Sequence, residues 1–496
     1  MLPPTATITE IREAIASRSV RASVVVEGAL GRIAEHNPAL NAVLEVFGDE
    51  AMGQAADLDR RLRDSSEPMG PLAGVPILVK DNICLDRGKT TCGSRMLAGY
   101  SSPFSATAVQ RLEEAGAIIV GKTNMDEFAM GSSGEHSYFG PTGNPYDTAR
   151  VPGGSSSGSA AAVAARLTPV ALGSDTGGSI RQPASYTGCV GLKPTYGRVS
   201  RWGLVAYASS LDQIGPITTT VSDAAIMLDV LAGFDPLDAT SAEMESAHAF
   251  VSVERPIEGL RLGVPREAGS QANDESVRAA FNRAMETFRS LGAEVVDFDL
   301  PTLDAAISTY YLVAMAEASS NLARFDGIRY GHRATLKEGE GLEALYARSR
   351  SEGFGAEVQR RIMLGCYALS SGYYDDYYLT ALKARRRMKQ DFDRAFGAGL
   401  DAIVMPTAPD AAFPIGEMSD DPLAMYLEDI YTVSANLAGL PAISVPMGTA
   451  TTDSGKHLPL GLQLIAPAFE EVRLLRIARM FERASSPIPL PAGFGL

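Results

Sequence analysis

A stretch rich in glycine and serine, residues 152–185, holds side chains whose types and spacing could do chemistry. It reads PGGSSSGSAAAVAARLTPVALGSDTGGSIRQPAS. A serine alcohol is a weak nucleophile at neutral pH, so it needs a base within reach. Lys80 ends the apolar run GVPILVK upstream of this stretch, and burial would favour its neutral amine, the form that accepts a proton. The sequence therefore predicts a serine nucleophile activated by a lysine.

Three familiar motifs fit the same stretch less well. Gly153 to Gly158 has the spacing of a phosphate-binding loop, but Ser159 stands where that loop needs its lysine. Residues 154–158 also match the nucleophile elbow of α/β-hydrolases, yet a loop-like, proline-containing segment precedes them where the elbow needs a strand. No serine lies three residues before a lysine, as the penicillin-binding enzymes require.

Ser179 is the best placed nucleophile. It directly follows Gly177 and Gly178, which come after the strand-like run TPVALGS. Two glycines allow successive N–H groups to point at one spot, which is what an oxyanion hole requires. The site is therefore expected just beyond the end of a buried strand.

Composition limits the class of protein. The 496 residues include 44 basic and 59 acidic ones, a net charge of −15, which disfavours direct nucleic-acid binding but leaves room for a nucleic acid held by a partner. The four cysteines have no CxxC spacing, which suits a reducing compartment. We expect no signal peptide, no membrane span and no metal site, and a cytoplasmic location.

The pattern of elements predicts an α/β fold. The first 65 residues read as helices, and from about residue 70 strands alternate with helices, interrupted by a mainly helical block. One large mixed or parallel sheet, covered by helices on both faces, is the simplest architecture. We expect a single domain over 1–496, with a helical N-terminal segment 1–65, a catalytic core 66–235 and a helical insertion at about 305–396.

The site residues resemble those of the amidase signature family. The match runs through GGSSSG at 153–158, GSDTGGSIR at 173–181 and Pro183, and Ser155 lies 75 residues after Lys80 and 24 before Ser179. The resemblance implies the amidase signature fold, with a large mixed, mostly parallel central sheet. It also implies a Ser-Ser-Lys triad in which Ser179 is the nucleophile, Ser155 the proton relay after a cis peptide bond, and Lys80 the base. Amides around Thr176, Gly177, Gly178 and Ser179 would hold the oxyanion.

Within that family, the chain is most similar to the A subunits of glutamine-dependent tRNA amidotransferases. Segments such as GLKPTYGRVSRWGLVAYASSLDQIGP and RRIMLGCYALSSGYYDDYY carry this likeness. It implies hydrolysis of glutamine, with the ammonia passed on to convert Glu-tRNA(Gln) or Asp-tRNA(Asn) to the amide. The partners would be the B and C subunits and, through them, misacylated tRNA. This chain would bind no cofactor, and ATP and Mg²⁺ would sit on a partner subunit.

Glutamine is a zwitterion, so its pocket needs a cation for the carboxylate and an anion for the ammonium. By the resemblance, Arg361 would take the carboxylate and Asp429 the ammonium, with Tyr310 alongside. Arg360 and Tyr311 are adjacent alternatives. Two other functions stay open: a stand-alone amidase that acts on other small or peptide amides with the same triad, and a non-catalytic scaffold, which the intact triad disfavours.

Overall fold

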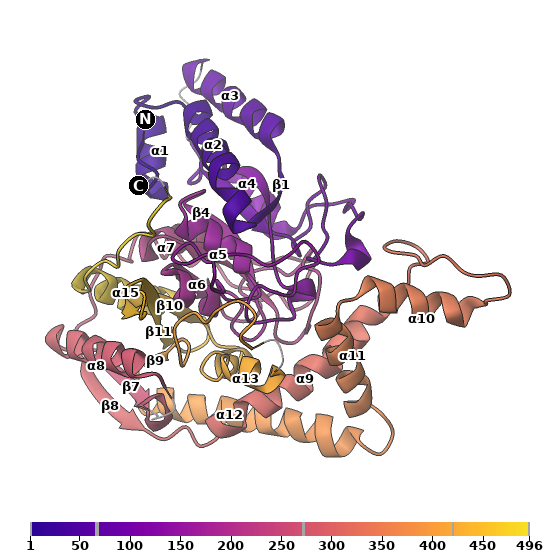
Figure 1. Ribbon diagram of the computed structural model, residues 1–496. Helices are drawn as coiled ribbons and strands as arrows, with labels where there is room; N and C mark the ends of the chain where they lie inside the picture. The colour runs from indigo at the N-terminus through magenta and orange to yellow at the C-terminus, as the bar shows by residue number, and fades with distance from the viewer. Residues whose placement is uncertain (1, 65–68, 270–272, 419–420, 495–496) are drawn as a thin grey trace.

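The computed structural model describes residues 2–64, 69–269, 273–418 and 421–494. The boundary expected between the N-terminal segment and the catalytic core, at residues 65–66, lies outside this part of the chain. The described strands form one eleven-stranded sheet in the order β1-β3-β2-β4-β6-β5-β10-β11-β9-β7-β8 (Figure 1). Their bounds are β1 Val43–Val46, β2 Pro76–Lys80, β3 Ile118–Thr123, β4 Val170–Asp175, β5 Val190–Lys193, β6 Gln213–Thr218, β7 Arg261–Pro265, β8 Glu294–Phe298, β9 Ala402–Pro406, β10 Ala442–Thr451 and β11 His457–Ile465.

The predicted α/β fold with a large mixed sheet is confirmed. Parallel pairing occurs in two blocks, β3-β2-β4 and β9-β7-β8. The strands between these blocks, and the edge strand β1, pair antiparallel. The parallel share is thus smaller than expected, with four parallel pairs against six antiparallel ones among the described strands. Short connections such as that between β10 and β11 favour antiparallel hairpins over crossovers.

Helices cover both faces of this sheet. α5 and α6 pack together on one face, and α7, α15 and α8 pack in succession on the other (Figure 1). The α-helices are α1 Ile8–Ala16, α2 Ala22–Leu40, α3 Gly48–Asp64, α4 Thr107–Glu114, α5 Ser157–Ala164, α6 Arg181–Thr187, α7 Val221–Leu231, α8 Glu275–Ser290, α9 Ala306–Asn321, α10 Leu342–Gly353, α11 Ala356–Ala368, α12 Thr380–Gly397, α13 Pro422–Leu427, α14 Val433–Leu437 and α15 Glu471–Ala484. None of these helices combines the length and the apolar character needed to cross a membrane.

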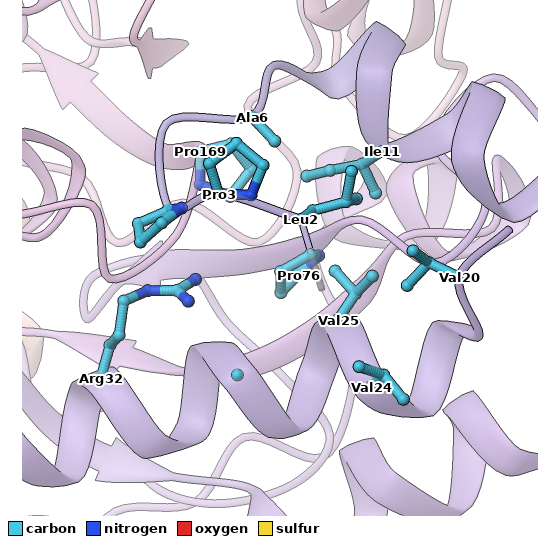
Figure 2. Close-up of a pocket in the computed structure, with 12 residues that line it drawn as sticks. Leu2, Pro3, Ala6, Ile11, Val20, Val24, Val25, Arg32, Pro76 and Pro169 are labelled. Atoms are coloured by element: carbon cyan, nitrogen blue, oxygen red, sulfur yellow. The ribbon is translucent and has the colours of Figure 1, made fainter. Parts of the chain in front are cut away.

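The expectation that the N-terminal segment is helical throughout is wrong. Between α2 and α3 it contributes β1, which pairs with β3 at the edge of the sheet. Its first residues and α2 line a mainly apolar groove that Pro76 and Pro169 also line (Figure 2). Pro76 opens β2, and Pro169 directly precedes β4, so this groove lies at the amino ends of these two parallel strands. It is therefore at the opposite end of the strands from Lys80.

Helices fill the stretch where the insertion was expected. α9, α10, α11 and α12 follow one another there, and α10 projects away from the body of the molecule (Figure 1). α9 packs against both α11 and α12. Most residues of α9 are buried, including Tyr310 and Tyr311. α9 is therefore the inner helix of the group formed by α9, α10, α11 and α12. α11 turns Arg361 inward and leaves Met363 and Tyr367 on its outer side.

Candidate active site

Lys80 lies at the carboxyl end of β2 and is completely buried. β2 pairs in parallel with β4, so the carboxyl ends of the two strands meet at the same edge. The Lys80 Nζ lies 2.7 Å from Ser155 Oγ, 2.9 Å from Ser156 Oγ and 3.0 Å from Ser174 Oγ. A second contact with Ser174, at 3.3 Å, goes to its carbonyl oxygen. The amine is thus enclosed by hydroxyls and one carbonyl.

The hydrogen-bond partners of Lys80 can take both hydrogens of a neutral amine and leave its lone pair for Ser155. Ser156 Oγ donates to the Ser174 carbonyl at 3.1 Å, so it must accept from Lys80. A second hydrogen of the amine is taken by Ser174, whose carbonyl and hydroxyl oxygens both lie within reach. A neutral amine has two hydrogens and one lone pair. In that neutral form the lone pair can face the Ser155 hydroxyl, 2.7 Å away, whose proton it would accept.

Burial makes that neutral form available. It lowers the Lys80 pKa to about 7, although the carboxylates of Asp126, Asp175 and Asp212 oppose the shift. Two other lysines, Lys122 and Lys193, are also buried. Lys122 lies 3.3 Å from Asp81, and Lys193 donates to the Pro194 carbonyl, so neither contacts a serine hydroxyl among the described residues. Lys80 alone combines burial with contacts to serine hydroxyls there.

Ser155, the expected relay, stands on a tightly packed loop. The peptide bond between Gly154 and Ser155 is cis, as the family resemblance implied. Gly154 has no room for a side chain, since a Cβ would lie 1.9 Å from Asp126 Oδ2. The Ser155 carbonyl accepts from the Asp126 N–H at 3.3 Å. The next residue, Ser156, donates its N–H to the Ser179 carbonyl at 3.1 Å, so the loops that carry Ser155 and Ser179 lie side by side.

The loop after β4 is held by a buried carboxylate that sequence reasoning missed. Asp175 accepts from the Gly178 N–H at 2.9 Å and from the Ile180 N–H at 3.2 Å. It also forms two contacts of 3.0 Å with the Arg181 guanidinium. Burial alone would raise the Asp175 pKa, but the charge and hydrogen bonds of Arg181 outweigh this effect and lower the pKa to about 2. This ion pair fixes the turn that presents Ser179, which is 8% exposed.

In this structure one of the expected oxyanion donors already has a hydrogen-bond acceptor. The N–H of Gly178 is occupied by Asp175 and does not face the site. The N–H groups of Thr176, Gly177 and Ser179 donate to no described residue in this structure, so they stay free for an oxyanion. The role of Gly178 is conformational: its φ of +143° and the contact its Cβ would make with Thr432 Oγ1, at 2.3 Å, require glycine.

The structure separates the two candidate arginines. Arg361 is 2% exposed, and its Nη1 donates to the Tyr207 hydroxyl at 2.9 Å. Its Nε donates to Glu357 at 2.7 Å, and three tyrosine rings lie within 5.8 Å of its guanidinium carbon. The side chain of Arg360 is 43% exposed and pairs with Glu357 from the outside. Arg361 is therefore the arginine that faces the interior.

Asp429 lies in the same buried cluster. Its Oδ2 accepts from Ser132 Oγ at 2.5 Å and from the Tyr311 hydroxyl at 3.4 Å. Burial raises the Asp429 pKa to about 7. The hydrogen bond from Ser132 and the positive charges of Arg361 and Arg181 lower the pKa, but they offset only part of the effect of burial. Tyr310 lies against the loop that carries Ser179, since a Cβ on Gly177 would be 2.5 Å from its Cζ. Both tyrosines therefore line the site, in edge-to-face contact at 5.0 Å.

Known proteins are similar to this chain over most of its length. The Amidase family matches residues 24–475. The A subunit of the glutamyl-tRNA(Gln) amidotransferase of Synechococcus sp. (strain RCC307) is 54% identical over 95% of this chain and 96% of its own. The protein of the same name from Pseudomonas aeruginosa (strain LESB58) is 51% identical over 98% and 99%.

Two solved structures have the same fold. The A subunit of the glutamyl-tRNA(Gln) amidotransferase of Thermotoga maritima superposes with a TM-score of 0.81 at 42% identity, covering 98% of each chain. A peptide amidase from Stenotrophomonas maltophilia superposes with a TM-score of 0.82 at 33% identity, also covering 98% of each. The fold thus carries activities on different amides, so the substrate must be argued from the pocket.

Proposed function

Because this chain belongs to the amidase family, we propose that it hydrolyses glutamine as the A subunit of a glutamine-dependent tRNA amidotransferase. The observation that carries the proposal is the placement of Arg361 and Asp429 around Tyr311, whose neighbour Tyr310 covers Gly177. A cation and an anion on two sides of one buried cluster suit a zwitterionic amino acid. The names of the similar subunits support the same substrate and complex.

The proposed chemistry is acyl transfer through a Ser-Ser-Lys triad. Ser179 Oγ attacks the amide carbon, its proton moves to Ser155 Oγ, and the Ser155 proton moves to the neutral amine of Lys80. The oxyanion is held by free N–H groups of the loop at Thr176 and Gly177, and by that of Ser179. Lys80 then returns the proton through Ser155 to the leaving nitrogen, and ammonia departs from the acyl-enzyme. Water repeats the same steps and releases glutamate.

Substrate recognition would use the buried charges. Arg361 offers its remaining guanidinium N–H groups to the α-carboxylate of glutamine. Asp429, once ionised, accepts from the α-ammonium, and Tyr310 closes the pocket beside the reacting amide. Ser132 keeps one oxygen of Asp429 in place. The two charged contacts would set the distance from the amino-acid head to the amide, so that the carbonyl reaches Ser179.

The ammonia would serve a partner. We propose that B and C subunits accompany this chain, that ATP and Mg²⁺ are bound by a partner subunit, and that misacylated tRNA binds through the complex in the cytoplasm. The product would be Gln-tRNA(Gln), Asn-tRNA(Asn) or both. The net charge of −15 supports a tRNA contact made mainly by partners.

Ammonia release tests the proposal. The full chain, purified with any other subunits that accompany it, should release ammonia from glutamine in preference to butanamide, and Ser179→Ala should abolish release from both. Lys80→Ala should be nearly as damaging. Acyl-enzyme should form on mixing with substrate in the unmodified protein but not in Ser179→Ala, as mass spectrometry would detect. Rapid hydrolysis of simple or peptide amides with glutamine ignored would favour the stand-alone amidase instead.

A further inference from the structure

A chain of buried hydrogen bonds joins the oxyanion loop to Arg361. Thr176 Oγ1 donates to Asp212 Oδ1 at 2.7 Å. The other Asp212 oxygen accepts from the Tyr207 N–H at 2.9 Å, and the Tyr207 hydroxyl accepts from Arg361 Nη1 at 2.9 Å. All four residues are at most 2% exposed. The link spans three segments: the turn after β4, the loop before β6, and α11.

The two middle members of the link, Asp212 and Tyr207, are held by further hydrogen bonds. Asp212 Oδ1 also accepts from the Ala208 N–H at 3.1 Å, so three donors converge on a carboxylate that has no ion-pair partner within 4.0 Å among the described residues. The carbonyl of Tyr207 accepts from Asn321 Nδ2 at 3.1 Å, which fixes the tyrosine backbone from α9. Tyr207 thus contacts Arg361 through its hydroxyl and Asp212 through its N–H, and Asp212 in turn accepts from Thr176.

We infer that Tyr207 is a positioning residue through which the arginine that would bind the substrate carboxylate is tied to the oxyanion loop. The inference rests on the proposed function and deepens it. A substrate carboxylate that binds Arg361 would hold the guanidinium against the Tyr207 hydroxyl. Through Asp212, this contact would also hold Thr176 and the free N–H groups beside it in place. Amides with a carboxylate would then gain in turnover as well as in binding.

Three amides with the same reacting group separate the contributions. Glutamine has both charges, glutaramate has the carboxylate alone, and butanamide has neither. In the unmodified full chain, glutaramate should exceed butanamide in kcat. Tyr207→Phe removes only the hydroxyl, so the kcat/KM for glutamine and glutaramate should fall about 10- to 100-fold with kcat falling too, while butanamide changes less than about twofold.

Two further variants guard the result. Tyr196→Phe is the matched control, because Tyr196 donates to the Ser209 carbonyl in the same loop at 2.8 Å and has no described contact with Arg361. This variant should leave the ratio of kcat for glutaramate to kcat for butanamide unchanged. Thr176→Val breaks the other end of the link, so it should lower the same ratio in kcat while the KM for glutaramate stays within about twofold.

The outcomes are distinguishable. An equal fall for all three amides in Tyr207→Phe, an effect on KM alone, or no effect would overturn the inference. Equal turnover of glutaramate and butanamide by the unmodified chain would overturn it as well. A clear preference for the carboxylate without any further preference for glutamine would instead refute glutamine as the substrate and leave the positioning role of Tyr207 in place.

Discussion

Lowering the pH is the most direct test of Lys80 as the proposed base, because only the neutral amine can accept the proton of Ser155. Its pKa of about 7 means that half of the molecules are competent at pH 7. An amine at the ordinary value of 10.5 would be neutral in about one molecule in three thousand at that pH. Burial in this cage therefore increases the competent fraction about a thousandfold. The kcat/KM for butanamide should fall about tenfold per pH unit below 7 and be level above it.

Glutamine should behave differently from butanamide below neutral pH. The pKa of Asp429 is also about 7, and the protonated acid cannot pair with the substrate ammonium. Two protonations then each remove activity, so the kcat/KM for glutamine should fall by up to about a hundredfold per pH unit once both groups are protonated. Asp429→Asn should lower the activity with glutamine and return its slope to about tenfold.

The assay is ammonia release at limiting substrate between pH 5.5 and 9, in buffers of constant ionic strength. Both amides are followed with the same protein, so losses from unfolding appear equally in the two profiles. A level butanamide profile across the whole range, or one that is still rising about tenfold per pH unit at pH 9, would refute a Lys80 pKa of about 7 as the control on activity. Equal slopes for glutamine and butanamide would refute the role of Asp429.

Three further predictions concern the residues around the triad. The free energy of unfolding of the unmodified protein should rise relative to that of Lys80→Met as pH increases from 7 to 10.5, by at most about 1.4 kcal/mol per pH unit. The reason is that the lysine of the unfolded chain still holds a proton that the buried amine has lost. Urea unfolding at pH 7 and 9 measures this difference, and a difference that does not change with pH would contradict the prediction. Asp175→Asn should cost about 3–5 kcal/mol in the same assay, since it leaves Arg181 buried without its carboxylate, and a cost below about 1 kcal/mol would show that the pair is dispensable. Gly178→Ala should lower kcat for butanamide about a hundredfold or more, because the new Cβ meets Thr432; near-normal turnover would show that the turn can relax.

Local sequence signals were enough for most of the elements and for the types of residue in the site. The apolar run ending at Lys80 is β2, and the run TPVALGS contains most of β4. Both are short buried strands bounded by turn residues, which is where periodicity and composition are most informative. β1 was missed because its four residues lie between two long helices and only pairing with β3 makes them a strand.

The residues that complete the site could not be found in the same way. Ser174 contacts Lys80 because β2 and β4 are neighbours in the sheet, and strand order is not encoded locally. Tyr207 meets Arg361 across 154 residues of sequence. The occupied N–H of Gly178 depends on the rotamer of Asp175. Such contacts arise from tertiary packing, whereas motif spacing shows only which residues are close along the chain. One signal was available for Asp175, which directly precedes the TGGS turn and has an arginine six residues later.

The closed cage around Lys80 has a consequence for the form in which nitrogen is released. Since the amine has no exposed surface, a proton it has accepted exchanges poorly with bulk water and is handed back along the hydroxyls that delivered it. Acylation would then begin and end with the same number of protons at the site, and the departing molecule would be uncharged NH₃ with its electron pair intact. Uncharged ammonia is still a nucleophile and can move past apolar walls that would stop an ammonium ion.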